Sequence, residues 1–476
     1  MTDHALRPAP RTPGAPKPPP PPTQTRIQPR AVTGTYTRRR WFMVWLTQLV
    51  YYGTPWLRWD DRQAVLFDVE TPRFHLFGLV LQPQDLIFVV GLMVVLALTL
   101  FFFTAIAGRL WCGYACPQTV YSSIFLWIEH RFEGDRPARL RLDRSPWTRD
   151  KLLRRGGKHL AWLLVALAFG VTFVGYFEPI DVLARQVATA SPTPWTTFWI
   201  LCCALGVYGN AGWLREQVCT FMCPYARLQS TMIDADSLVI AYDTGRGEPR
   251  GARSRKAASG DGGLGDCTDC GACVQACPTG IDIRKGLQNE CIACAACADA
   301  CDEVMDRMGY APGLIRYASA NALAHGWTRA RMMQRLRRPR VLIYGAALLA
   351  SMVGLVAAMA LRTPVSMDVM RDRGVMARLG DEGRIENVYR VQLMDHSATD
   401  TDYVLSAEGL PGLTVDGGAV WSLPAGQVRP FTLRLSVPGD GPAAATPGTH
   451  AVTLRLSVRS GDGTVLRERT TFIVPR

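Results

Sequence analysis

The stretch CTDCGACVQACPTGIDIRKGLQNECIACAACADACD, residues 267–302, contains two cysteine runs with the same spacing. Each run reads Cys-x₂-Cys-x₂-Cys-x₃-Cys, and the second begins 24 residues after the first. Three thiolates at this spacing can surround three irons of a cubane, whereas the fourth ligates the other cluster in two-cluster ferredoxins. The pattern therefore predicts two [4Fe–4S] clusters, one held by Cys267, Cys270, Cys273 and Cys301, and the other by Cys291, Cys294, Cys297 and Cys277.

A zinc site is the alternative for any Cys-x₂-Cys pair, but structural zinc takes four ligands, usually in two pairs. Two triplets and two single cysteines would leave thiolates without a role, so we favour the clusters. The second run ends in Asp302 where the first has Pro278. This difference leaves all the thiols in place.

Outside this module, five stretches approach or reach the ~20 apolar residues that a bilayer crossing requires. The second and fifth contain no charged residue, while the first and third are shorter and have buried core helices as an alternative. We expect five transmembrane helices, at Trp41–Leu57, Leu86–Ala107, Leu160–Phe177, Trp195–Trp213 and Val341–Leu361.

Basic residues collect beside these stretches, in a chain with a formal charge of +13 and 48% hydrophobic residues. A nucleic-acid-binding protein would place them along a groove or a folded face, so we expect no nucleic-acid partner. Positive loops stay cytoplasmic, and arginines precede the first stretch and fill the loop between the second and third. This predicts that the N-terminus and residues 214–340 are cytoplasmic and that the chain after Arg362 lies outside.

All 14 cysteines lie between Cys112 and Cys301, so the segment predicted to lie outside has none. Disulfide scaffolds form in oxidising compartments, and these cysteines therefore indicate metal or redox chemistry on the reducing side. Residues 1–37 are rich in Pro, Thr and Arg, which predicts a disordered cytoplasmic tail. No small-residue cleavage site follows, so we expect the first helix to remain as an anchor.

Two further motifs, WCGYACPQT (111–119) and VCTFMCPYA (218–226), each contain Cys-x₃-Cys-Pro at the end of an apolar stretch. Residues four apart share a helix face, and the two halves of the membrane region look like weak repeats. Soft thiolates favour Cu(I). We therefore expect a copper-binding or redox site, with packing cysteines as the alternative, at Cys112, Cys116, Cys219 and Cys223. The adjacent Cys202 and Cys203 are expected to be small apolar side chains.

Residues 362–476 alternate with a period of two, as in FTLRLSV (431–437) and VTLRLSV (452–458), with Gly, Pro and Asp turns between. This alternation predicts an antiparallel immunoglobulin-like β-sandwich. The expected domains are the tail at 1–37, a four-helix membrane region at 38–226, a ferredoxin-type module with linkers at 227–340, a fifth helix at 341–361 and the sandwich at 362–476.

Two common electron carriers are not predicted. A membrane haem needs histidines that face each other within the spans, and all seven histidines lie in loops, tails or at span edges. No Gly-x-Gly-x-x-Gly follows a predicted strand, so nothing indicates a Rossmann-type nucleotide site. Electrons must come from a partner, and we expect a cytoplasmic donor.

Six stretches carry a family resemblance: PWLRWDDRQAVLFD (55–68), GRLWCGYACPQTV (108–120), LREQVCTFMCPYARLQ (214–229), YDTGRGEPRG (242–251), the run from Cys277 to Asp302, and GLIRY (313–317). They closely resemble the FixG/CcoG family of cytochrome c oxidase accessory proteins, over about residues 40–340, and the C-terminal sandwich matches in kind. Leu228 stands where the family has Phe, which casts no doubt on the thiols.

The resemblance implies a bacterial inner-membrane protein that reduces Cu(II) to Cu(I) while the copper site of cbb3-type cytochrome oxidase is assembled. It implies cluster ligation by the eight ferredoxin cysteines, copper or redox roles for the two Cys-x₃-Cys-Pro pairs, and oxidase subunits or copper-delivery proteins as partners. Two other functions stay open. One is a quinol-linked electron-transfer subunit of a periplasmic reductase system, and the other is a non-catalytic scaffold for oxidase assembly.

Overall fold

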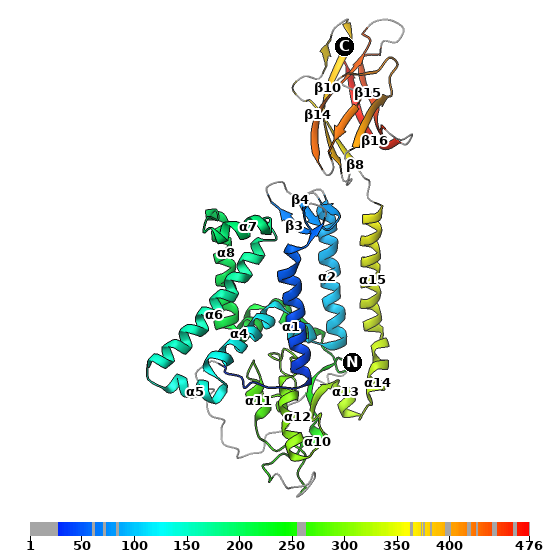
Figure 1. The fold of residues 1–476 in the computed structure, drawn as a ribbon. Coiled ribbons are helices and arrows are strands. Elements are labelled where there is room, and N and C mark those ends of the chain that lie inside the picture. The colour runs from blue at the N-terminus through cyan, green and yellow to red at the C-terminus, as the bar shows by residue number, and fades with distance from the viewer. Residues whose placement is uncertain are drawn as a thin grey trace. The chain divides into compact units, whose positions relative to one another are not determined.

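Figure 1 shows the fold as a computed structural model. The chain divides into two compact units, one made of Met1–Val44, Phe103–Leu164 and Val207–Leu336, the other of Trp45–Phe102, Val165–Gly206 and Arg337–Arg476. Most of the predicted tail, residues 1–26, lies outside the described residues. The structure describes residues 27–59, 62–69, 73–81, 85–254, 263–361, 365–372, 374, 377–380, 383–395, 401–416, 420–424, 427–439, 445–459 and 464–475.

Among the described residues, four helices are long and apolar enough to cross a membrane. They correspond to the second to fifth predicted stretches. Large apolar side chains on them are exposed, for example Ile87 at 73% and Leu349 at 63%, as expected for helices that contact lipid. The four are α2 (Leu86–Ala107), α6 (Arg149–Val174), α8 (Pro194–Val207) with the π-helix η3 (Tyr208–Leu214) that continues it, and α15 (Pro339–Ala360).

The first predicted span, Trp41–Leu57, falls mostly on helix α1 (Thr35–Gly53). The helix ends at Gly53 because Pro55, in the 3₁₀ turn η1 (Thr54–Trp56), has no N–H with which to continue the helical hydrogen bonds. α1 is not one of the four helices above. The five-span arrangement and its orientation therefore stay predictions.

The ferredoxin-type module belongs to the first unit. Helices α11 (Ala272–Ala276) and α12 (Ala296–Met308) belong to the two cysteine runs, and strands β6 (Val239–Tyr242) and β7 (Ile315–Ala318) pair antiparallel. All four elements contribute to one buried core, which includes Ile240, Ile283, Met305 and Leu314. The neighbouring elements are α3 (Leu110–Tyr114), α4 (Pro117–Glu133), α5 (Arg136–Arg144), η4 (Val218–Met222), α9 (Pro224–Met232), α10 (Thr244–Gly247), η6 (Ile283–Lys285), α13 (Ala320–Ala324), α14 (Arg329–Gln334) and η7 (Arg335–Arg337).

A small sheet that was not predicted from the sequence belongs to the second unit. Strands β3 (Val65–Asp68), β4 (Arg73–Leu76) and β5 (Leu79–Leu81) are antiparallel, and β1 (Arg58–Trp59) pairs with β2 (Arg62–Gln63). The buried Gln63 donates to the Gly175 carbonyl at 2.7 Å and accepts from the backbone N–H of Ile180 at 3.0 Å. These bonds attach the strands to the start of α7 (Ile180–Ala188).

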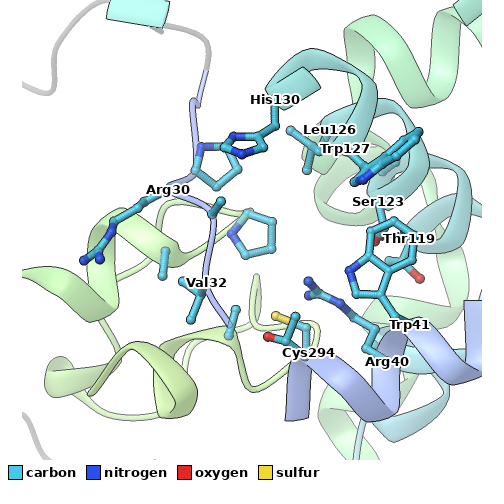
Figure 2. A pocket seen from close by; sticks show the side chains of 18 of the residues that line it. Arg30, Val32, Arg40, Trp41, Thr119, Ser123, Leu126, Trp127, His130 and Cys294 are labelled. Atoms are coloured by element: carbon cyan, nitrogen blue, oxygen red, sulfur yellow. Dashed lines mark hydrogen bonds between the residues drawn. The ribbon is translucent and has the colours of Figure 1, made fainter. Parts of the chain in front are cut away.

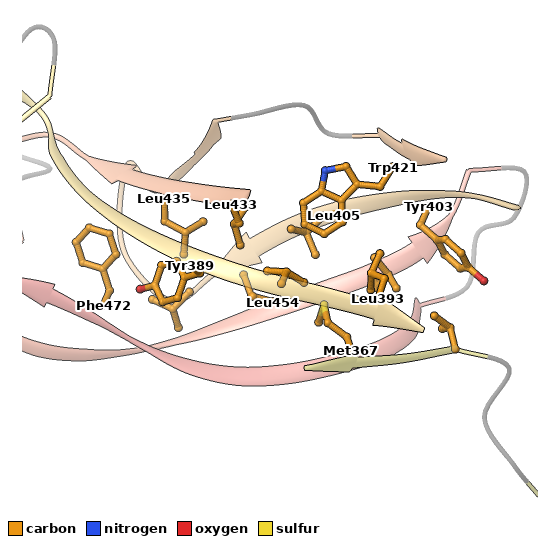
Figure 3. Close-up of a cluster of buried hydrophobic side chains, with 14 of the residues drawn as sticks. Met367, Tyr389, Leu393, Tyr403, Leu405, Trp421, Leu433, Leu435, Leu454 and Phe472 are labelled. Atoms are coloured by element: carbon orange, nitrogen blue, oxygen red, sulfur yellow. The ribbon is translucent and has the colours of Figure 1, made fainter. Parts of the chain in front are cut away.

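The C-terminal part of the chain folds as two antiparallel sheets, as its period-two alternation predicts. Alternate side chains of both sheets form one core, in which Tyr389, Leu393, Leu454 and Phe472 are fully buried (Figure 3). The predicted sandwich is confirmed. One sheet has the order β12 (Thr414–Asp416), β14 (Val428–Val437), β10 (Ile385–Asp395), β8 (Val365–Arg371), with β9 (Arg378–Leu379) also paired to β10, and the other has the order β13 (Val420–Leu423), β11 (Thr401–Glu408), β15 (Gly448–Val458), β16 (Thr464–Val474).

Candidate metal centres

Two small cavities in the first unit are lined by the cysteines of the two runs. In each cavity, the fourth cysteine of one run lies with the first three of the other, which is the exchange that two-cluster ferredoxin ligation requires. The first cavity contains Cys267, Cys270, Cys273 and Cys301, and the second contains Cys277, Cys291, Cys294 and Cys297.

The loops that carry these cysteines repeat the same backbone shape. Asp269 and Gly271 are left-handed, with φ of 50° and 67°, and the equivalent Ala293 and Ala295 have φ of 54° and 57°. Left-handed residues turn the chain sharply, and those with a Cβ do so at a cost in strain. Helices α11 and α12 each start directly after the second of these residues. The repeated turn curls each loop around its cavity.

The donor set fits an iron–sulfur cluster. A cubane spreads four thiolates around several irons, and apolar side chains such as Ile283 and Leu314 border the cavities. Within the described residues, no three His, Cys, Asp or Glu side chains are grouped closely enough to hold a single metal ion. The assignment of individual ligands stays a prediction, which the two cavities support.

The Cys-x₃-Cys-Pro pairs lie at helix breaks. Cys112 is on α3, whereas Cys116 lies beyond the end of α3 and directly before α4. Cys219 is on the π-helix η4, and Cys223 lies directly before α9. The expectation that each pair shares the face of one helix is therefore wrong. The proline after each pair starts a new helix, where its missing N–H costs no helical hydrogen bond.

The two motifs nevertheless lie in the same part of the first unit, where Gln118, Thr119 and Cys219 line one small cavity. Burial raises the pKa of Cys112 to about 12, and the thiols of Cys116, Cys219 and Cys223 add to the rise. Burial also raises the pKa of Cys219 to about 11, with Cys116 as the next cause. Such charge effects act over short distances. The two motifs are thus neighbours, as the resemblance between the two halves suggests, although within the described residues no three of the thiols are grouped closely enough to hold a single ion.

A buried chain of polar side chains begins at Cys112. Its thiol donates to Oε1 of Gln229 at 3.3 Å, and Gln229 donates through Nε2 to Oγ1 of Thr104 at 3.2 Å. Thr104 and the Tyr225 hydroxyl share a hydrogen bond of 2.9 Å. Gln229 is fully buried. Its role was not predictable from the sequence, because glutamine is mostly an exposed residue and only the packing around Cys112 reveals that role.

Arg109 connects the thiol site with the loop of the second cysteine run. Its buried guanidinium donates to the backbone oxygens of Asn289, Cys291 and Ala226, the bond to Cys291 being 3.3 Å long. Burial dominates the pKa of Cys112, but the positive charge of Arg109 acts in the opposite direction and favours the thiolate. The arginine therefore positions two metal-binding segments and moderates the charge between them.

Gly113 brings the first thiol motif into direct contact with the same loop. A Cβ at position 113 would lie 2.8 Å from the carbonyl oxygens of both Ile292 and Ala293. The Tyr317 hydroxyl donates to the same Ala293 oxygen at 2.5 Å and lies 3.5 Å from the Tyr114 hydroxyl. Only glycine allows this approach, so the backbone of the thiol motif packs directly on the loop between Cys291 and Cys294.

Two aspartates of the second run also make contacts that sequence analysis missed. Asp299 accepts hydrogen bonds from the backbone N–H groups of Tyr36 at 3.1 Å and Thr37 at 2.6 Å. It therefore caps the N-terminus of α1, where a carboxylate is favourable. Asp302 accepts a hydrogen bond of 2.7 Å from the backbone N–H of Gly313. This acceptor accounts for the aspartate at the position equivalent to Pro278.

The apolar helices and the paired cysteine cavities define an iron–sulfur electron-transfer protein with helices typical of a membrane protein. Family models agree with this class. A 4Fe–4S dicluster domain matches residues 214–320, an immunoglobulin-like fold at the C-terminus of FixG matches residues 355–475, and a 4Fe–4S binding domain matches residues 89–133.

The chain is 39% identical over 430 residues to the nitrogen fixation protein FixG of Rhizobium meliloti (strain 1021), an alignment that covers 83% of this chain and 82% of that protein. It is 38% identical over 458 residues to protein RdxA of Cereibacter sphaeroides, covering 94% and 96%. The chain therefore belongs to the FixG family. A crystal structure of a FixG-related protein from Vibrio parahaemolyticus aligns with 23% of this chain and 95% of that chain, at 22% identity and a TM-score of 0.20.

Proposed function

We propose that this protein reduces Cu(II) to Cu(I) at the four-thiol site, during assembly of a cbb3-type cytochrome c oxidase. The observation that carries the proposal is the packing of the first thiol motif on the Cys291–Cys294 loop, through Gly113 and Arg109. An electron that reaches the second cysteine cavity is then one loop away from the thiols. Membership of the family that includes FixG supports a role in electron transfer.

The chemistry needs a one-electron source and a soft metal site. Iron–sulfur clusters supply single electrons when bound. Reduction of copper consumes one electron for each Cu(II) and yields one Cu(I), without transfer of a proton. The role of the thiols is to hold the Cu(I) product, because thiolates prefer soft ions. The role of Arg109 is to favour thiolate at Cys112 and Cys219 through its charge.

In this proposal α1 and the four apolar helices cross the bacterial inner membrane. The arginines at 38–40 and along 131–155 support a cytoplasmic position for the N-terminus and the clusters, because positive loops stay inside. The sandwich then lies in the periplasm. Oxidase subunits or copper-delivery proteins are the partners that receive the Cu(I).

A third iron–sulfur cluster is a second candidate occupant of the thiol site. The 4Fe–4S binding domain that matches residues 89–133 includes Cys112 and Cys116. Two clusters contain about eight irons in total, and three contain about twelve. Iron analysis of the purified protein therefore separates the two candidates before any copper is added.

The test is Cu(II) reduction by the full-length protein, purified with its clusters, reduced with dithionite and desalted. Cu(I) is measured as its bathocuproine complex. Wild-type protein is expected to form Cu(I), and the variant with all four thiols changed, Cys112→Ser, Cys116→Ser, Cys219→Ser and Cys223→Ser, is expected to form almost none while it retains its iron.

The matched control is Cys202→Ser with Cys203→Ser, which removes two cysteines of α8 that lie outside the thiol site. It is expected to behave like the wild type. Copper reduction at the wild-type rate by the four-thiol variant would remove copper chemistry from this site. Loss of about four irons in that variant would instead assign a cluster to it.

A further inference from the structure

A cavity of about 170 Å³ in the first unit has no role in the function proposed above. Figure 2 shows it between the segment that leads into α1, helix α4 and the loops of the two cysteine runs. Cys294, a predicted ligand of the second cluster, is part of its wall. The cavity is therefore next to a redox centre. Gly113 and Thr119 of the first thiol motif are also part of its wall, whereas the four thiols of the Cys-x₃-Cys-Pro pairs do not line it.

The cavity is small and largely apolar. Pro29, Val32, Trp41, Leu126 and Ile292 are among the residues that line it. Sites for drug-sized ligands have volumes of about 300–1,000 Å³. A cavity of about 170 Å³ accommodates one substituted ring, whereas a dinucleotide is too large.

The basic side chains around the cavity differ in how they are neutralised. Nη1 of Arg139 lies 3.1 Å from a carboxylate oxygen of Glu129, and Nη2 of Arg30 lies 3.2 Å from one of Glu303. Within the described part of the chain, Arg40 forms no such ion pair, and Figure 2 shows its guanidinium directed into the cavity. One guanidinium without a carboxylate suits a ligand with a carbonyl or phenolate oxygen.

Two further side chains add polar positions. The Ser123 hydroxyl donates to the Thr119 carbonyl at 2.7 Å, so the lone pairs of Oγ remain for a hydroxyl group of a ligand. His130 also lines the cavity, and its side chain is 46% exposed, with Nδ1 at 3.9 Å from the Asp135 carboxylate. His130 therefore lies between the cavity and the solvent.

Two tryptophans place the cavity within reach of lipid. The rings of Trp41 and Trp127 pack edge to face with centroids 6.4 Å apart, and Trp127 is 55% exposed. Trp41 is also the residue at which the apolar part of α1 begins. Tryptophan is enriched at membrane–water interfaces. A ligand dissolved in the membrane can approach the cavity at this edge.

We propose that this cavity binds the ring of a lipid-soluble hydroquinone-type electron carrier. The inference rests on the proposed electron-transfer function and replaces the cytoplasmic donor that the sequence led us to expect. Oxidation of a hydroquinone to its quinone releases two electrons and two protons. Each iron–sulfur cluster accepts one electron, so the two clusters together accept the two electrons of one hydroquinone. His130 passes the two protons to solvent. Arg40 and Ser123 hold the ring oxygens.

The test is equilibrium binding of decylubiquinone, and separately of menadione, to the full-length protein in detergent, measured by titration calorimetry without copper. Wild-type protein is expected to show one saturable site for at least one of the two probes. Arg40→Gln is expected to weaken binding about tenfold, because a hydrogen bond from a charged donor is lost. Leu126→Trp, which fills the cavity, is expected to abolish it.

The matched control is Arg38→Gln, which changes an exposed arginine of the same helix that does not line the cavity. Its affinity is expected to equal that of the wild type. Iron content and cluster absorbance show which variants are folded. If Leu126→Trp does not fold, the more conservative Arg40→Gln variant still tests the site. No saturable binding of either probe, or equal binding by wild type and Arg40→Gln, would overturn the site.

This outcome is distinguishable from failure of the proposed function. Dithionite reduces the clusters without a quinone, so dithionite-reduced wild-type protein tests copper reduction alone. Copper reduction without quinone binding would refute the cavity's role and leave the proposed function intact. Quinone binding without copper reduction would refute the proposed function and leave the quinone site intact.

Discussion

The two cysteine runs share their spacing and their backbone turns, but they contact different parts of the molecule. The first run is held by polar segments of the module: Arg253 donates to the Cys267 carbonyl at 3.3 Å, and Arg284 pairs with Asp282 at 2.8 Å. The second run contacts the first thiol motif through Gly113 and the start of α1 through Asp299. Equivalent ligand loops therefore have unequal surroundings.

In the proposed function, this difference gives the electron path a direction. The second cavity shares Ile292 and Cys294 with the cavity beside Arg40, and Gly113 of the thiol motif packs on the same loop. The first cavity is lined by residues of the module itself, such as Tyr242, Arg284 and Leu314. Ligand spacing determines that two clusters can bind. The neighbours of each loop determine which cluster exchanges electrons with other groups. Substitutions near the second run should therefore change iron content, stability or copper reduction more than the matched substitutions at control positions.

Gly113→Ala should have the largest effect. The added Cβ would lie 2.8 Å from two carbonyl oxygens of the second run, and relieving such an overlap costs on the order of 3 kcal/mol. The iron content is expected to fall towards half as the second cluster is lost, measured by iron analysis and absorbance. Gly156→Ala is the control, since nothing lies within 4 Å of its Cβ position. Equal iron in the two variants would contradict the contact.

Arg109→Met should have the next largest effect. It leaves three backbone oxygens, including that of Cys291, without their charged donor, and each buried group left unpaired costs about 1–3 kcal/mol. Thermal unfolding in detergent is expected to shift to lower temperature, together with slower copper reduction. Arg227→Met changes an exposed arginine of α9 and serves as the control. Identical unfolding of the two variants would show that Arg109 does not connect the sites.

Asp299→Ala removes the cap of α1 and should destabilise the protein by about 1–2 kcal/mol. The equivalent residue of the first run is the exposed Gln275, and Gln275→Ala is expected to have little effect. Thermal unfolding of both variants measures the difference. If they unfold at the same temperature, the asymmetry between the runs does not extend to α1.

Asp302→Ala should have the smallest effect, about 1 kcal/mol, because one hydrogen bond to a backbone N–H is lost. Pro278→Ala, at the equivalent position, removes no hydrogen bond and is expected to change stability less. Chemical unfolding followed by cluster absorbance compares the two. A larger loss for Pro278→Ala would mean that the aspartate is not needed at position 302.

Several features of the fold were predictable because they depend on local pattern. Helix α2 spans Leu86–Ala107, the residues expected from its uncharged apolar run. The alternation in FTLRLSV falls on β14, with Leu433, Leu435 and Val437 buried. The start of α1 was not predictable, because its cap comes from Asp299, more than 200 residues away. The small sheet at residues 58–81 was missed for a similar reason, since Gln63 is fixed by bonds to residues near 175–180.

The thiol site shows the same limit. The spacing of four predicted that each pair shares a helix face, but each proline starts a new helix, so that Cys116 and Cys223 lie outside the preceding helical segments. The residues around the thiols, Arg109, Gln229 and Gly113, are types that occur everywhere on protein surfaces and in turns. Nothing in the sequence around them indicates that they contact the thiol site. Their roles exist only because α9 and the second cysteine run lie beside them.

The cysteine spacing by itself determined that this protein is of the iron–sulfur type, because a thiolate can reach a cubane only from a few positions along a short loop. Apolar length likewise determined the four membrane-type helices. Only the tertiary structure decided that the second run contacts the first thiol motif through Gly113 and α1 through Asp299. That choice depends on side chains and carbonyl groups far apart in the chain, and contacts of this kind leave no periodic pattern in the sequence.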